Sequence, residues 1–494
     1  MSEASTLPAS QELLGPPERL HPLYLLTGLG QSVRGAWGLL AGGAVLASQG
    51  RWWIAIALVT ASAVLSFVSL FMRWLKLEYR VGAHELRIDS GWMSRTSRAI
   101  PFDRVTDVDL EQGPLHRLFG LARVKLETGA SAGGKEEEGV LHTISLERAE
   151  ELREHIRARR GRAAVPTSDV SAIDVPAIYA MDTRRVLTAG LFNFSLAVIA
   201  GLFGVTQTMG EALGFNPFER QFWIDLFARS GPLRDLIMAH RVGAAVAGSL
   251  LLVLIGIGTG LVRTLLREHG FQLDRTETGF RRRRGLLTLT DVSIPAKRVQ
   301  AAILADGPIR RRFGWWVLKL QSLAQDGGRG DHVVAPLACE GEAAEILASL
   351  HWPVAPVQDA WQPVSRAFVT SFIGILIPAS LVTLIAIPFV GPIGLLWLAG
   401  ASMAIGIRWF DWKRTRYALE NGTLFVETGW WRHRRSMVPM RKIQTIDLAE
   451  SWWSRAFGIC TLRLGVAGGS GFSDHHVPAL SRAQAEALRA ELLS

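Results

Sequence analysis

Three short stretches of this chain place arginines or large apolar side chains directly beside a glycine, and they are its best candidates for binding another molecule. The candidates are Trp92 and Met93 after Gly91, Arg281, Arg282, Arg283 and Arg284 before Gly285, and Trp430, Trp431, Arg432, Arg434 and Arg435 after Gly429. Such tips suit a membrane surface, because aromatic rings enter the headgroup region and each basic residue gains about 1 kcal/mol against an anionic leaflet. The alternative is that the tryptophans pack on a sheet and the arginines form its solvated face.

Patterns typical of catalysis or metal binding do not accompany these stretches. The sequence has no P-loop and no HExxH motif, and Cys339 and Cys460 are too far apart to form a CxxC metal site. His475 and His476 have no cysteine or carboxylate at ligand spacing, and we interpret them as part of a solvated loop. The arginine clusters come without a recognition helix or a stacking platform for nucleic acid. We therefore expect no enzyme activity, no metal, no cofactor and no nucleic-acid partner.

The composition is typical of a membrane protein. Of the 494 residues, 49% are hydrophobic, yet the formal net charge is +10, so apolar and basic residues occupy separate stretches. The apolar residues concentrate in three blocks, residues 34–72, 186–262 and 367–407, and each block suits a helical hairpin at about 20 residues per span. Five of the six expected helices reach that length, whereas residues 35–48 fall short. The alternative, buried core helices of a soluble protein, explains six uncharged stretches in three pairs poorly.

The distribution of basic residues predicts how the hairpins are oriented. Lysine and arginine are rare in the hairpin loops and frequent in the segments between the blocks, which places both termini and the three large soluble segments in the cytoplasm. The loop at residues 207–239 would then face outward. Within the expected helices, ionisable residues stand only at the ends, which argues against a proton-coupled transporter.

The soluble segments after the three hairpins repeat one pattern without gaps. Each has a glycine ten residues before a proline, then an arginine sixteen residues and a glycine nineteen residues past that proline. The landmarks are Gly91, Pro101, Arg117 and Gly120 in the first copy, Gly285, Pro295, Arg311 and Gly314 in the second, and Gly429, Pro439, Arg455 and Gly458 in the third. The first glycine supplies the positive φ of a hairpin turn, and the proline belongs at the start of a strand or on a sheet edge.

Alternating runs around these landmarks predict strands, and each copy closes with a helix. Helices are expected at residues 147–159, 340–350 and 481–493, the last with a capping box from Ser481 and Gln484. The predicted division is an N-terminal segment (1–33), a hairpin (34–72), a first β-domain (73–160), a linker (161–185), a hairpin (186–262), a second β-domain (263–350), a linker (351–366), a hairpin (367–407) and a third β-domain (408–494).

A hairpin followed by this glycine, proline and Arg-x-Phe-Gly pattern resembles the bacterial PH-like (bPH type 2) domains of YdbS/YdbT-like membrane proteins. The resemblance includes Arg19-Leu20-His21-Pro22 ahead of the first apolar block. It implies an α+β membrane protein of the bacterial inner membrane, in which each of three transmembrane hairpins precedes a PH-like antiparallel β-sandwich or barrel with a C-terminal helix. The second copy departs most from the pattern, since Leu273 stands where the other copies have Tyr79 and Tyr417.

Two functions stay open at this point. The first is a non-enzymatic membrane protein whose three cytoplasmic PH-like domains bind an anionic lipid headgroup, a protein partner or one another, with a role in envelope homeostasis. The second is a transporter or lipid-handling protein with a path between the six helices. The near-absence of buried ionisable residues disfavours a transporter, although an apolar cargo needs no charges.

Overall fold

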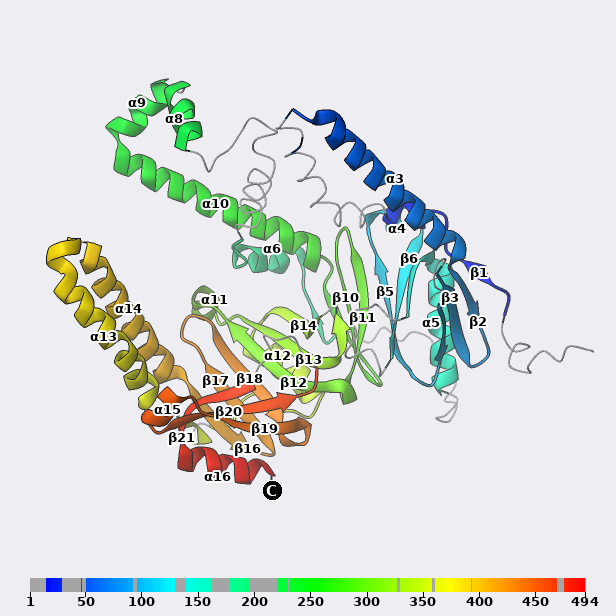
Figure 1. Cartoon of the computed structure of the whole chain (residues 1–494). Coiled ribbons are helices and arrows are strands. Elements are labelled where there is room, and N and C mark those ends of the chain that lie inside the picture. Colours follow the sequence, from blue (N-terminus) through cyan, green and yellow to red (C-terminus); the bar gives the residue numbers. More distant parts are fainter. Residues whose placement is uncertain are drawn as a thin grey trace, which may run out of the picture. The chain divides into compact units, whose positions relative to one another are not determined.

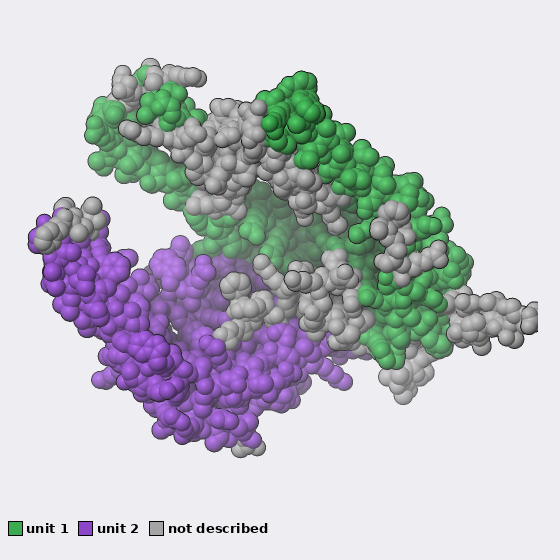
Figure 2. Space-filling model, viewed as in Figure 1, with its two compact units in different colours: residues 1–173, 181–271, 283–292 green, residues 174–180, 272–282, 293–494 purple. Residues whose placement is uncertain are grey.

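The computed structural model describes residues 15–28, 46, 50–91, 96–128, 139–161, 177–195, 220–229, 231–326, 329–357, 360–391, 393–468 and 475–493. The chain divides into two compact units, which Figure 2 shows in green and purple. Unit 1 comprises residues 1–173, 181–271 and 283–292, and unit 2 comprises residues 174–180, 272–282 and 293–494. Both units combine antiparallel strands with long apolar helices, which confirms the α+β class (Figure 1).

Unit 1 contains the first copy of the repeat. A four-stranded sheet has the order β1-β2-β3-β4, from β1 (Glu18–Arg19), β2 (Glu78–Val81), β3 (Glu85–Ser90) and β4 (Thr96–Pro101). Three further antiparallel strands follow, β5 (Val105–Gln112), β6 (Leu121–Thr128) and β7 (Val140–Ser145), with the short helix α4 (Pro114–Leu118) between β5 and β6. Helix α5 (Leu146–Gly161) closes the copy. Leu86, Leu126 and Ile156 are buried in one core that the strands and this helix share.

A strand of the second copy pairs with the first copy inside unit 1, and this contact is named the first junction. Residues 289–291 of β11 (Leu289–Pro295) pair antiparallel with β5. Arg117 Nη1 donates a 2.8 Å hydrogen bond to the carbonyl oxygen of Leu286. Arg153 of α5 forms a 2.9 Å ion pair with Asp291. The junction therefore joins two copies through a strand edge, an arginine and the closing helix.

The longer helices of unit 1 carry its apolar sequence. They are α3 (Trp52–Lys76), α6 (Thr183–Leu191), α8 (Arg220–Arg229), α9 (Gly231–Ala239) and α10 (Arg241–Glu268). The chain after α6 packs tightly on α10, because a Cβ on Gly260 would lie 1.9 Å from the carbonyl oxygen of Asn193. Small residues in an apolar helix permit such close approach.

Unit 2 is built around one seven-stranded antiparallel sheet with the order β14-β13-β12-β18-β17-β16-β15. The second copy supplies β12 (Val299–Asp306), β13 (Trp316–Asp326) and β14 (Arg329–Ala338). The third copy supplies β15 (Gln362–Pro363), β16 (Arg416–Glu420), β17 (Thr423–Thr428) and β18 (His433–Pro439). Strands β8 (Tyr179–Ala180) and β9 (Gln272–Thr276) also belong to unit 2, whereas β10 (Gly279–Arg284) and β11 are divided between the units.

The pairing of β12 with β18 inside this sheet is the second junction. Asp306 lies opposite His433, and Leu304 lies opposite Arg435. Arg311 of the short helix α11 (Pro308–Arg312) donates to the carbonyl oxygen of Trp430 at 3.2 Å. The sequence predicted self-contained β-domains, but strands of neighbouring copies share sheets at both junctions.

A three-stranded sheet completes the third copy. Its order is β19-β20-β21, from β19 (Ile443–Ala449), β20 (Ile459–Val466) and β21 (His475–Ser481). The remaining helices of unit 2 are α12 (Glu340–Ala348), α13 (Ala367–Val390), α14 (Ile393–Arg414), α15 (Trp452–Ala456) and α16 (Arg482–Leu493). Helix α16 packs Leu488 and Leu492 against Leu462 and Leu480 of the sheet.

Three helices of the described residues are long and apolar enough to cross a membrane: α3, α10 and residues 367–388 of α13. Six spans are thus not confirmed. The expected helix at residues 35–48 lies outside the described residues. The expected helix at residues 186–206 begins as α6 but ends at Leu191, and residues 196–219 lie outside the described part. Helix α14 forms a hairpin with α13 (Figure 1), but Arg408, Asp411 and the basic residues after them limit its apolar length.

The repeat landmarks have the local conformations that their residue types predict, with one exception. Gly285 and Gly429 adopt φ of 121° and 86°, and Gly314 adopts 70° at the end of a short helix. Ser481 and Gln484 form the expected capping box, with the Ser481 N–H donating to Gln484 Oε1 at 3.1 Å. The prolines do not begin strands. They end β4, β11 and β18, because a fixed φ near −65° suits both a last strand residue and the turn that follows.

Candidate functional site

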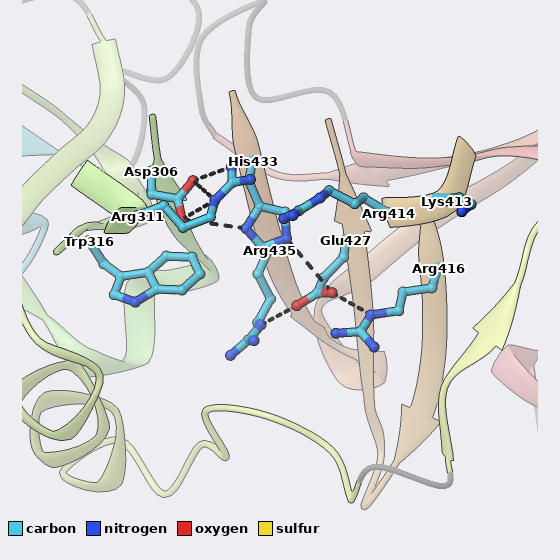
Figure 3. Close-up of a pocket in the computed structure, with 9 residues that line it drawn as sticks. All are labelled: Asp306, Arg311, Trp316, Lys413, Arg414, Arg416, Glu427, His433 and Arg435. Carbon is cyan, nitrogen blue, oxygen red and sulfur yellow. Dashed lines mark hydrogen bonds and ion pairs between the residues drawn. The ribbon is translucent and has the colours of Figure 1, made fainter. Parts of the chain in front are cut away.

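A charged cleft of about 510 Å³ lies in unit 2, where β12 meets β18 (Figure 3). The second copy contributes the end of β12, helix α11 and the start of β13, and the third copy contributes the end of α14 with strands β16, β17 and β18. The lining residues are Asp306, Arg311, Trp316, Lys413, Arg414, Arg416, Glu427, His433 and Arg435. The second junction therefore creates the cleft, because neither copy supplies all of its lining.

Glu427 is the centre of the ion pairs in this cleft. Its side chain is only 2% exposed, and it accepts hydrogen bonds from Arg416 Nε at 2.5 Å and Arg435 Nε at 2.7 Å, one on each side (Figure 3). Burial alone would raise the pKa of Glu427, but the nearby His433 imidazole, the hydrogen bond from Arg416 and the charge of Arg435 lower it to about 2. Glu427 is therefore ionised at any physiological pH.

Asp306 anchors the other side of the cleft. Its side chain is fully buried, and Arg311 Nη2 donates to its Oδ1 at 2.8 Å. Burial opposes ionisation, yet the nearby His433 imidazole and the hydrogen bonds from Arg311 lower the pKa of Asp306. Arg311 thus connects the carboxylate of its own copy to the Trp430 carbonyl of the next copy.

His433 lies between the two carboxylates. Its Nδ1 is 3.8 Å from Asp306 and its Nε2 is 3.7 Å from Glu427. Burial lowers the pKa of His433, but attraction to the nearby carboxylates of Asp306 and Glu427 outweighs burial and raises it above the usual value. The two carboxylates therefore favour the protonated, positively charged form of the His433 imidazole.

The cleft carries a surplus of positive charge, because its two carboxylates face six basic side chains. Lys413 and Arg414 are exposed in the last turn of α14, where a helix dipole favours cations. The Arg416 side chain is 43% exposed, and its guanidinium lies 4.3 Å from the Trp361 ring centre. Arginine and lysine donors arranged in this way suit an anion with several oxygens, such as a phosphate group.

Other ion pairs tie the cleft to the rest of the second junction. Arg435 Nη1 lies 2.9 Å from Glu340 at the start of α12. Its guanidinium is therefore held from two sides, by Glu340 of the second copy and Glu427 of the third. Trp316 forms one wall, with its ring centre 5.5 Å from that of His433.

None of the candidate residues of the second stretch lines this cleft. Trp92 and Met93 lie outside the described residues. Arg281, Arg282, Arg283 and Arg284 belong to β10 rather than to an exposed tip. Arg282 is fully buried and donates to the Val333 carbonyl oxygen at 3.1 Å, and buried Arg284 pairs with Glu268 at 3.0 Å. These two guanidinium groups satisfy buried acceptors.

The third stretch is divided between the surface and the cleft. Trp430 stacks on Phe410 with a ring-centre distance of 5.3 Å, whereas Trp431 is 59% exposed and Arg432 is exposed beside it. Arg434 is half-buried and donates to Ser436 Oγ at 3.0 Å. Of the predicted binding residues that the structure describes, Arg435 alone lines the cleft.

Sequence reasoning missed the other lining residues. Arg311 stood out only as a repeat landmark, and nothing in the sequence brings Asp306 beside His433, because their contact depends on the pairing of two distant strands. The interpretation of His475 as a solvated residue is wrong. It lies in β21, is buried, and its Nε2 is 2.7 Å from Gln321 Oε1.

Comparison with known proteins identifies the repeat. The family model of the bacterial PH domain matches three times, at residues 24–160, 227–352 and 368–494. Transmembrane protein YdbT of Bacillus subtilis (strain 168) is 25% identical over 276 residues, which cover 53% of this chain and 51% of YdbT, so the chain spans about half the length of that relative. Transmembrane protein YdbS of the same organism is 33% identical over 119 residues, 23% of this chain and 71% of YdbS. No solved structure gives a significant match.

Proposed function

Because the chain belongs to the bacterial PH domain family and is a membrane protein, we propose that it is a non-enzymatic protein of the bacterial inner membrane whose cleft binds a phosphate-bearing lipid headgroup. The observation that carries this proposal is the surplus of basic side chains at the end of α14. That helix returns from a hairpin with the apolar helix α13, so its last turn lies where a chain leaves the membrane. The cleft would then open at headgroup depth.

Aromatic side chains beside the cleft support this placement. Trp409, Phe410 and Trp431 are exposed large hydrophobic residues, and Lys413 Nζ lies 3.9 Å from the Trp409 ring centre. Tryptophan and neighbouring basic residues are enriched where helices pass through the membrane interface.

Bound lipid provides the test. The full-length chain, purified in mild detergent, is analysed for retained lipid by native mass spectrometry, together with the variant Lys413→Gln plus Arg414→Gln. Loss of two basic residues at about 1 kcal/mol each predicts binding of anionic lipid weaker by about 30-fold. Arg489→Gln is the matched control, since Arg489 is exposed on α16 outside the cleft. Unchanged lipid in the cleft variant would refute headgroup binding, and loss of a co-purifying protein instead would favour an interaction scaffold.

We place both termini and the three PH-like copies in the cytoplasm, because the basic residues accompany these copies. A reporter that works only in the cytoplasm, fused after Ser494, should be active. An inactive fusion at a normal expression level would contradict this orientation without bearing on the cleft.

A further inference from the structure

Two strands lie at the edges of their sheets, whereas the corresponding strands in the other copies have a neighbouring strand on both sides. Among the described residues, β4 is the last strand of the sheet β1-β2-β3-β4, and β19 is the first strand of the sheet β19-β20-β21. The repeat alignment matches β4 with β11 and β18, and it matches β19 with β5 and β12. Those four counterparts pair with each other, β5 with β11 and β12 with β18. One strand edge of each type is thus left over.

The two internal junctions use one register. Leu289 lies opposite Gln112 in the first junction, and His433 lies opposite Asp306 in the second. Leu289 and His433 each stand six residues before the landmark proline of their copy, and Gln112 and Asp306 each stand eleven residues after theirs. Because the same register occurs at both junctions, we take it as a property of the repeat. A further pairing between strands of these two types would therefore have the same register.

Burial shows that the leftover edges are accessible. In β12, Ala301 and Ile303 are buried, whereas Thr445 and Asp447 at the matching positions of β19 are exposed. In β18, residues 435–439 are buried, whereas Thr96, Ser97 and Ala99 of β4 are exposed. An exposed strand edge presents backbone donors and acceptors ready to pair with another strand.

The landmark arginine supplies independent support. At each internal junction it donates to the carbonyl of the residue after the next copy's hairpin glycine, Arg117 to Leu286 at 2.8 Å and Arg311 to Trp430 at 3.2 Å. Arg455, the third landmark arginine, is 71% exposed and its nearest carboxylate oxygen, on Glu450, is 3.8 Å away. The corresponding carbonyl in the first copy belongs to Trp92.

We propose that β19 of one chain pairs antiparallel with β4 of a second copy of the same chain, in the register of the internal junctions. That register places Asp447 opposite Arg98 and Ala449 opposite Thr96, so the two edges carry complementary charges. Arg455 would donate across the contact to the second copy, as Arg117 and Arg311 donate across the internal junctions. Because different surfaces meet, the contact is heterologous and generates a ring or an open filament. The proposal does not depend on the lipid cleft.

Disulfide trapping tests the register in the full-length chain. Thr96→Cys and Ala449→Cys are introduced after Cys339→Ser and Cys460→Ala remove the native thiols, and the protein is oxidised in detergent or nanodiscs. We expect a ladder of disulfide-linked dimers and larger species on a non-reducing gel. Ala99→Cys with Ala449→Cys is the matched control, since a slip of three residues moves the sulfurs about 10 Å apart along the strand, beyond disulfide reach.

Mixing two single variants distinguishes a contact between chains from one within a chain. Chains with Thr96→Cys alone, mixed with chains with Ala449→Cys alone, should give dimers and nothing larger. No dimer from the mixture, or only a linkage inside one chain in the double variant, overturns the proposal.

A charge exchange tests the same pairing without cysteines. Asp447→Arg alone and Arg98→Asp alone should each weaken self-association by about fivefold, because like charges then lie opposite each other. The double variant should restore association, measured by mass photometry over a dilution series. Single variants that associate as well as the wild type, or a double variant no better than either single, would contradict the pairing.

Discussion

Replacing Glu427 with glutamine should lower the stability of unit 2 and at the same time strengthen its binding of anions. The carboxylate is buried and holds Arg416 and Arg435, while His433 lies 3.7 Å away. Glutamine keeps the size of the side chain but removes its charge. The three cationic groups then lose their common partner, and the cleft gains one net positive charge.

The size of the effect follows from the pKa of Glu427. A fall from 4.5 in the unfolded chain to about 2 in the folded one corresponds to about 3 kcal/mol of stability near neutral pH. Because the folded pKa is the lower one, this stability is fully present above about pH 5 and is lost as the pH falls toward 2, leaving about 1 kcal/mol at pH 3. The penalty of Glu427→Gln should therefore shrink over the same range.

Urea unfolding of the full chain in mild detergent, followed by tryptophan fluorescence, measures this difference at pH 7, 5, 4 and 3. Glu486→Gln is the matched control, because the Glu486 side chain is 58% exposed and its loss should cost less than about 0.5 kcal/mol. In parallel, the retained anionic lipid should increase in Glu427→Gln. A variant within about 0.5 kcal/mol of the wild type at pH 7, or a penalty that does not change between pH 5 and pH 3, would refute the reasoning.

Three further predictions concern single sites. Burial, reinforced by the charges of Arg434 and His476, lowers the pKa of His475 to about 3, so between pH 6.5 and pH 3 the unfolded chain binds a proton at this residue and the folded chain does not. In urea unfolding, the wild type should therefore lose about 2 kcal/mol of stability between pH 7 and pH 5 relative to His475→Gln. The same pH dependence of the unfolding free energy in both proteins would contradict this. Gly285→Ala should cost about 1–3 kcal/mol of unfolding free energy by the same measurement, because φ is 121° and a Cβ would lie 1.9 Å from the Thr288 carbonyl oxygen. Gly258→Ala should cost nothing, because a Cβ at Gly258 would have no atom within 4 Å. Equal costs for the two variants would exclude local strain as the cause. At the first junction, a double-mutant cycle of Arg153→Ala and Asp291→Ala should give a coupling energy of about 1–3 kcal/mol, and additive effects would show that their 2.9 Å contact does not stabilise the chain.

Features coded by neighbouring residues were predictable from the sequence. Gly285 and Gly429 take positive φ because a tight turn requires it, and Ser481 caps α16 because its hydroxyl reaches an N–H three residues on. Spacing alone therefore indicates such features. The α+β class and the repeat follow from the same local patterns.

The junctions and the cleft were not predictable in this way. The pairing of β12 with β18 joins strands of two copies, and no local pattern in either sequence indicates which strand it pairs with. Asp306, Glu427 and His433 gain their roles only through that pairing. At Arg282 the sequence is misleading, because a run of four arginines suggests a cluster exposed to solvent. In the structure the run lies in strand β10, where alternate residues face the interior, and Arg282 is buried.

The two junctions carry salt bridges of opposite polarity. At aligned strand positions, Asp291 meets a basic residue of a closing helix, Arg153, whereas Arg435 meets an acidic one, Glu340. If β5 paired with β18 by mistake, Arg153 would approach Arg435 in a largely buried setting, where like charges repel strongly. The polarity of these two salt bridges therefore favours the pairing of the first copy with the second over its pairing with the third.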